Sequence, residues 1–291
     1  MNQLLGTLRF YATGCHQQEA GYLCGFSKSS ACRIVHRVSN AIASLAPDYI
    51  KFPETDSEIL NTKQNFYGIA QFPKVIGVMD CTHVKIKSPG GTNAPQYVNK
   101  KGFPSLNIQC ICNANYEFTD IVAICCGSSQ DCDVFNSSCI KGKFEEGSYY
   151  CDSFILVDKN YPSTTYFVPL LKKAETSSEI LFNKSHMQTW SIVKTSIKNW
   201  KKRFPILAIG LRIKLDHVCD VIVATAVLHN IAQQNGETLP PDDPNLKISW
   251  ESLLQEGELN EDFDCKDPSV PDARHGLIQG HFKNLTESQG P

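Results

Sequence analysis

The pattern of apolar and polar positions in residues 74–87 predicts one strand. Residues 75–79 form an apolar run, Asp80 follows them, and polar and apolar types then alternate. Pro73 and Pro89 bound the stretch, and a short β-rich run between prolines is typical of a strand. Burial of this strand would bring the Asp80 carboxylate to the edge of the core, where it needs a metal ion or hydrogen-bond donors as partners.

Three more strands are predicted by alternation or by short buried runs, at residues 105–112, 118–126 and 153–158. The first two are close enough to form an antiparallel hairpin. The third ends in Asp158, so we expect Asp80 and Asp158 both to lie at the carboxyl ends of strands. Paired carboxylates in such positions could hold Mg²⁺ or Mn²⁺, which prefer oxygen ligands, activate water and bind phosphate.

Helical periodicity accounts for much of the remaining chain. The predicted helices are a short one at 17–23, then 27–45, 57–67 with a Ser57 cap, a helix after the turn 127–133, 183–204 and 216–234. The order strand, strand, strand, helix, strand, then helices predicts an α/β fold, a mixed sheet flanked by helices.

The first fifty residues predict a small helical head. Its first apolar positions at helical spacing are Leu4, Leu5, Leu8 and Tyr11. Ser27 can cap the second helix, and helix, glycine turn and capped helix outline a helix-turn-helix. In that motif the second helix enters the DNA major groove by its N-terminal end, where Lys28 and Arg33 would face outward. The same pattern fits a plain helical hairpin that packs on the following domain.

Composition narrows the class of protein. The chain has 291 residues, 42% of them hydrophobic and 20% charged, an ordinary globular balance. No run of eighteen apolar residues predicts a membrane span, and the N-terminus lacks the pattern of a secretory signal. The thirteen cysteines contain no Cys-x-x-Cys pair. They indicate reduced thiols in a protein of the nucleus and cytoplasm rather than disulfides or zinc.

Charge is distributed unevenly along the chain. Residues 183–214 contain eight Lys or Arg and no acid, whereas residues 237–264 contain nine acids and one Lys. The basic stretch could bind a polyanion such as DNA, although a solvated surface is an equal alternative. Its candidate contacts are Lys198, Lys201, Lys202 and Arg203. The acidic stretch indicates a loose, solvated tail.

These patterns divide the chain into four predicted parts. They are a helix-turn-helix-like head at 1–50, a connector at 51–73, a main α/β domain at 74–236 and an acidic, mostly loose tail at 237–291.

Seven stretches, in order, resemble the harbinger transposase-derived nucleases of the PIF/Harbinger family in the DDE superfamily. They are residues 4–14, 77–83, 127–135, 156–162, 182–186, 200–207 and 224–231. The resemblance covers about residues 3 to 235. It implies an RNase H-like core, divalent-metal-dependent cutting of DNA and a Myb-like DNA-binding partner protein. It also implies that Asp80, Asp131 and Asp158 are the acidic catalytic and metal-binding residues, although Asp131 and Asp133 could instead cap the helix that follows.

The chain departs from the family at the final acidic residue. A glutamate is expected 36 residues after Asp158, and that position is Lys194 (194 − 158 = 36). An ammonium group cannot coordinate a metal ion and repels it, so we expect impaired cleavage. Alternatively, Lys194 turns outward and two aspartates bind metal weakly. The first functional hypothesis is a nuclease-like protein with impaired cleavage. The second is a non-catalytic, co-opted descendant that binds DNA or a protein. A transposon relic without a retained function fits the sequence as well as this second hypothesis does.

Overall fold

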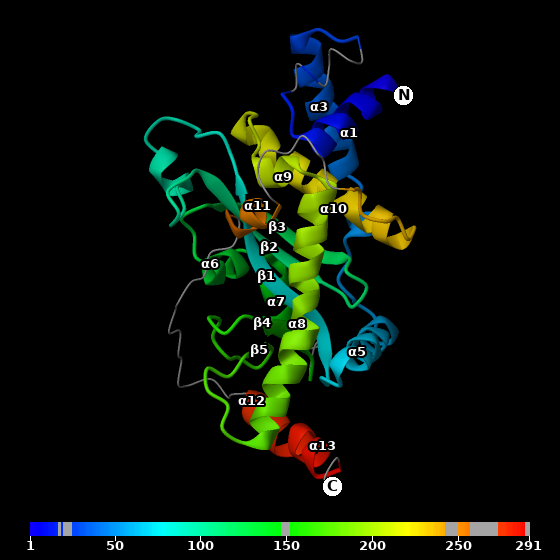
Figure 1. The fold of residues 1–291 in the computed structure, drawn as a ribbon, viewed down its shortest axis with the longest axis vertical. Helices are drawn as coiled ribbons and strands as arrows, with labels where there is room; N and C mark the ends of the chain where they lie inside the picture. The colour runs from blue at the N-terminus through cyan, green and yellow to red at the C-terminus, as the bar shows by residue number, and fades with distance from the viewer. Residues whose placement is uncertain (17–18, 20–24, 147–151, 242–249, 257–272, 289–291) are drawn as a thin grey trace.

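A mixed five-stranded sheet forms the centre of the molecule, with the N-terminal helices at one end and the C-terminal helices at the other (Figure 1). The computed structural model describes residues 1–16, 19, 25–146, 152–241, 250–256 and 273–288. The strand order is β3-β2-β1-β4-β5. The strands are β1 (Val75–Lys85), β2 (Ser105–Cys112), β3 (Phe118–Cys126), β4 (Phe154–Val157) and β5 (Phe167–Pro169).

Strand pairing confirms the predicted hairpin and fold class. β1, β2 and β3 pair antiparallel, whereas β4 pairs parallel with both β1 and β5. The result is a mixed sheet flanked by helices, consistent with the RNase H-like fold that the resemblance implies. The sequence analysis missed β5, a three-residue edge strand that ends in Pro169. Proline is tolerated there because it has no backbone N–H to donate, and the outer side of an edge strand has no neighbouring strand that needs one.

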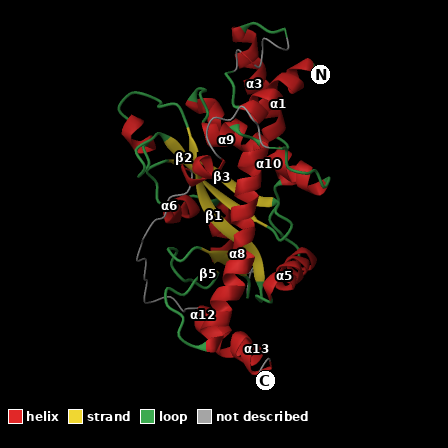
Figure 2. Ribbon diagram, in the orientation of Figure 1, coloured by secondary structure: helices red, strands yellow, loops and turns green. Residues whose placement is uncertain are grey.

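Helices cover both faces of this sheet (Figure 2). The larger hydrophobic cluster packs α8 (Ser177–Arg203) and α10 (Val218–Gln234) against one face. On the other face a smaller cluster joins β1 and β4 to α6 (Asp131–Asn136) and α7 (Cys139–Glu145). The single helix predicted after residue 133 is therefore two short helices, and Ser138 caps the second by accepting from Lys141 N–H.

Two capping boxes fix the starts of long helices. Thr55 caps α5 (Asp56–Ala70) together with Glu58, so the predicted Ser57 cap is wrong. Thr176 and Glu179 cap α8 in the same way, so this helix begins six residues before the predicted position 183. Each box satisfies two backbone donors that the first helical turn leaves unpaired.

The head packs onto the same core as the sheet. It consists of α1 (Asn2–Thr13) and α3 (Lys28–Ala43), with the predicted Ser27 cap in place, followed by α4 (Ala46–Tyr49). On α1 the buried residues are Gly6, Thr7, Phe10 and Tyr11, whereas Leu4 and Leu5 are exposed. The predicted apolar face is thus wrong in its first turn. The predicted helix 17–23 lies outside the described residues, and the four-part division stays a prediction.

The prediction of a loose C-terminal tail is wrong for the described residues beyond position 250. They form α11 (Trp250–Glu256), α12 (Ala273–Leu277), a π-helical turn η3 (Ile278–Phe282) and α13 (Lys283–Ser288). The Phe282 side chain is fully buried, with ring centroids 5.3 Å from Phe72 and 5.4 Å from Phe182. Leu277 and Ile278 are buried in the same core cluster, so apolar side chains attach this end of the chain to the core.

Short helices and one long apolar helix complete the chain. The short ones are η1 (Ala94–Tyr97), α9 (Ile206–Ile209) and η2 (Leu215–His217). Among the described helices, residues 215–234 are long and apolar enough to cross a membrane by length and composition alone. Within them, α10 packs on α3 and β3, and Asn230 hydrogen-bonds the backbone of Phe118 and Tyr49, as in a core helix. The ten described cysteines are free thiols, as predicted.

Candidate active site

Parallel pairing of β1 with β4 brings Asp80 and Asp158 to the same level of the sheet. Val78 pairs with Leu156, so the residue two positions further along each chain is an aspartate. Asp158 directly follows β4, as predicted. Asp80 lies inside β1 rather than at its end, because β1 continues beyond β4 to pair with β2 up to Lys85. The longer strand therefore presents its carboxylate beside the end of the shorter one.

Asp80 lies in an environment that disfavours its charge. The pKa of Asp80 is raised to about 7, chiefly by burial. The Lys194 ammonium opposes this rise, whereas the charges of Asp131 and Asp158 add to it. The Cys81 backbone N–H donates to Asp80 Oδ1 at 3.0 Å and also favours the ionised form. The structure therefore brings all four residues that the sequence singled out within electrostatic range of one another.

Asp131 is the first residue of α6. Its Oδ1 accepts a hydrogen bond of 2.7 Å from Asn107 Nδ2 on β2. The N-cap of this helix is Gln130, so the interpretation of Asp131 or Asp133 as the cap is wrong. The negative charge of Asp131 also raises the pKa of the Cys81 thiol, after the larger effect of burial. The negative charge of Asp131 therefore acts on groups at the Asp80 carboxylate.

Lys194 occupies the position of the expected glutamate and faces Asp80. Both residues line a small cavity of about 170 Å³ between β1 and α8. The Lys194 Nζ atom lies 4.9 Å from the centroid of the Trp190 ring, one helical turn earlier. Trp190 Nε1 donates to the Met79 carbonyl at 2.8 Å, which ties α8 to the residue preceding Asp80. This cation–π contact and hydrogen bond hold the ammonium at the site.

Lys201 proves to be an interior residue of this site. Its side chain is 1% exposed, and its Nζ donates to Thr82 Oγ1 at 2.6 Å and to the His83 carbonyl at 3.1 Å. Because Lys201 is buried, the prediction that it contacts DNA from the surface is wrong. Sequence reasoning missed Thr82, Trp190 and the inward direction of Lys201. The signal for Trp190 was its position four residues before Lys194, which places both on one helix face.

The other predicted DNA contacts differ in exposure. Lys28 and Arg33 are exposed on α3, and Lys198 is exposed at the rim of the Asp80 cavity. Lys202 is half-buried. Arg203 donates to the backbone carbonyls of Glu237 at 3.0 Å and Thr238 at 3.4 Å, so its guanidinium holds the chain after α10.

A C-terminal helix closes one side of the cavity. Leu254 of α11 is among the lining residues, and Leu253 is 5% exposed. The Lys101 ammonium donates to the Gln255 carbonyl, which attaches α11 to the loop after β1. Figure 1 shows α11 lying in front of the sheet beside α8. The tail therefore contributes to the site that the predicted domain division assigned wholly to residues 74–236.

The described side chains do not fit a metal centre. No three His, Cys, Asp or Glu side chains among them lie close enough together to hold a metal ion. The carboxylate Oδ1 of Asp131 accepts from Asn107, and Oδ2 of Asp158 accepts from Asn160 Nδ2 at 3.0 Å. Burial raises the pKa of Asp80 to about 7, which disfavours the charged form that a metal ion needs, and an ammonium lies where the family has its final acidic residue.

Comparison with known proteins identifies the family. The DDE superfamily endonuclease family matches residues 79–230. A human protein named "Putative nuclease HARBI1" is 34% identical over 80% of this chain and 67% of its own length. The proteins of that name from Rattus norvegicus and Xenopus laevis are 32% and 30% identical, each over 96% of this chain and 79% of their own length. No solved structure matches the chain.

Proposed function

This chain belongs to the DDE superfamily endonuclease family, and on that premise we propose that it binds DNA at a nuclease site whose cleavage is impaired by Lys194. One observation carries the proposal. The Lys194 ammonium lies in the same cavity as Asp80 and lowers the pKa of that carboxyl. The site thus keeps its aspartates but has a cation in place of its last acidic residue.

The charge at position 194 decides whether a divalent cation can bind. DDE endonucleases generally use a divalent metal, for which Mg²⁺ or Mn²⁺ is our proposal here. At about 4 Å and an effective dielectric constant of about 20, two unit charges interact by roughly 4 kcal/mol. A cation at Asp80 would be repelled by Lys194 where a glutamate would attract it. The ammonium partly neutralises the buried carboxylates, which preserves the fold without the metal.

Binding to nucleic acid is supported by the exposed cations near this site and on the head. Lys198 lies at the cavity rim, and Lys28 and Arg33 lie on the exposed face of α3. Contacts of this kind with phosphates do not depend on sequence and weaken steeply as salt increases. A Myb-like partner protein, implied by the family resemblance, and a location in the nucleus and cytoplasm, suggested by the reduced thiols, are further parts of the proposal.

A non-catalytic descendant that binds DNA or a protein partner is the second candidate, and the same cation favours it. Titration calorimetry with Mn²⁺ separates the two on the natural chain, on Lys194→Glu and on the control Lys184→Glu. The control makes the same charge change at an exposed residue ten positions earlier on α8. Nicking of supercoiled DNA is measured in parallel.

We expect Mn²⁺ binding only with Lys194→Glu, since that change puts a carboxylate in place of the ammonium that lines the same cavity as Asp80. Nicking by Lys194→Glu alone would show a cleavage site that the natural protein no longer uses. Metal binding and nicking by the natural chain would refute the proposed impairment. Equal Mn²⁺ binding by Lys194→Glu and Lys184→Glu would show that added negative charge attracts Mn²⁺ wherever it is placed, so that no specific site is involved.

A further inference from the structure

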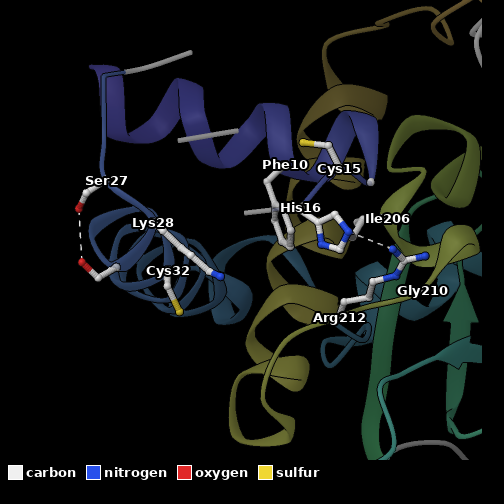
Figure 3. Close-up of a pocket in the computed structure, with 11 residues that line it drawn as sticks. Phe10, Cys15, His16, Ser27, Lys28, Cys32, Ile206, Gly210 and Arg212 are labelled. Carbon is white, nitrogen blue, oxygen red and sulfur yellow. Dashed lines mark hydrogen bonds between the residues drawn. The ribbon is translucent and has the colours of Figure 1, made fainter. Parts of the chain in front are cut away.

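A second, larger cavity lies between the head and the main domain. Its volume is about 620 Å³, and eleven described residues line it. They come from the end of α1, the start of α3, α9 and the segment after it (Figure 3). The cavity is separate from the Asp80 cavity, and the two share no lining residue.

The cavity exists because the head and α9 meet at a tight turn. Gly14 ends α1 with φ +62°, the left-handed conformation that favours glycine. A Cβ atom at this position would lie 2.6 Å from Cδ1 of Ile209. This close approach directs Cys15 and His16 toward the main domain and leaves an open space in front of the first turn of α3.

The lining of this cavity is cationic. None of its eleven residues is Asp or Glu, whereas Lys28 comes from the head and Arg212 from the main domain. Figure 3 shows the Lys28 side chain extending toward the space in front of His16 and Arg212. Arg212 Nη1 donates to His16 Nε2 at 3.2 Å, and since a guanidinium has no acceptor, the histidine ring nitrogen must accept. This bond holds the guanidinium at the cavity.

We infer that this cavity binds one backbone phosphate of DNA, held between Lys28 and Arg212. Two cations without a carboxylate select an anion, and arginine with lysine is the usual pair for phosphate. The occupant is DNA rather than a small metabolite because Arg33 continues the exposed basic face along α3 outside the cavity. Phe10 and Ile206 are buried beneath the cavity and form its apolar floor.

This inference rests on the proposed function that the chain binds DNA, so its test must separate the two. The assay is fluorescence anisotropy of a labelled 20-base-pair duplex at several salt concentrations. The variant is Lys28→Ala with Arg212→Ala; both side chains are exposed, so the fold should survive. The control, Lys184→Ala with Lys283→Ala, removes two exposed charges at the opposite end of the molecule (Figure 1). A charge-conserving variant, Lys28→Arg with Arg212→Lys, tests for rescue.

Loss of one phosphate contact lowers the salt dependence of binding by about 0.9 in log–log slope, or roughly eightfold in affinity at 0.1 M salt relative to 1 M. We expect this loss for the double alanine variant and natural behaviour for the control and charge-conserving variants. An unchanged slope with intact DNA binding would refute the phosphate site and leave the proposed function standing. No DNA binding by the natural chain would overturn both.

A small phosphate ligand is the remaining outcome, tested with a nucleoside monophosphate. If it binds the natural chain and not the double alanine variant, while duplex binding is equal for both, then the cavity binds a free nucleotide. That result would overturn its assignment to DNA.

Discussion

Replacing Asp80 with asparagine tests whether burial holds this carboxyl in its neutral form. The pKa of Asp80 is raised from its ordinary value of 3.8 to about 7, mainly by burial. The folded protein therefore binds this proton more tightly than the unfolded chain does. The stability that results is complete below pH 3.8 and is lost as the pH rises through about 7.

The two pKa values set the size of this effect. Between pH 5 and pH 8 the linkage relation gives a loss of about 2 to 3 kcal/mol in the free energy of unfolding. Asparagine does not ionise, so Asp80→Asn should avoid this loss. Relative to the natural protein, the variant should gain about 2 to 3 kcal/mol on going from pH 5 to pH 8. Lys194→Gln removes a charge that lowers the pKa of Asp80, so the loss should then occur at higher pH.

The measurement is urea unfolding followed by tryptophan fluorescence at pH 5 and pH 8. Comparing variant with natural protein at each pH cancels every other titrating group. Asp133→Asn, at the exposed start of α6, is the matched control and should show the same difference at both pH values. If Asp80→Asn also shows the same difference at both, the neutral buried carboxyl is refuted.

Three further substitutions test the elements that the sequence placed least well. Phe282→Ala should lower the free energy of unfolding by about 3 to 5 kcal/mol, because it empties a fully buried site against Phe72 and Phe182. The measurement is urea unfolding. A change under about 0.5 kcal/mol, which is typical of a surface site, would mean that the tail does not pack there. Thr176→Ala removes the side-chain acceptor that caps α8 and should cost about 1 kcal/mol in the same assay. Thr55→Ala should lower the free energy of unfolding by a similar amount at α5. No change in either variant would mean that these caps do not stabilise their helices.

The sequence by itself located four of the five strands and singled out the charged residues of the candidate site. Alternation located β2 at its observed limits, and the turn that precedes β3 located that strand at its own. The resemblance and the spacing of 36 residues singled out Asp80, Asp131, Asp158 and Lys194, and the charges of the last three act on the Asp80 carboxyl. Local pattern suffices where chain neighbours decide the conformation.

Only the tertiary structure decided which charges face solvent and what the ends of the chain do. A period of 3.6 places Lys201 on a helix, yet the burial of that ammonium depends on Thr82 and His83 of another element. The acidic composition of the tail predicts solvation, yet a few apolar side chains attach it to surfaces formed by distant residues. The cavity between Lys28 and Arg212 likewise joins positions 184 residues apart (212 − 28 = 184). Such contacts are set by packing across the fold, which no local window of sequence contains.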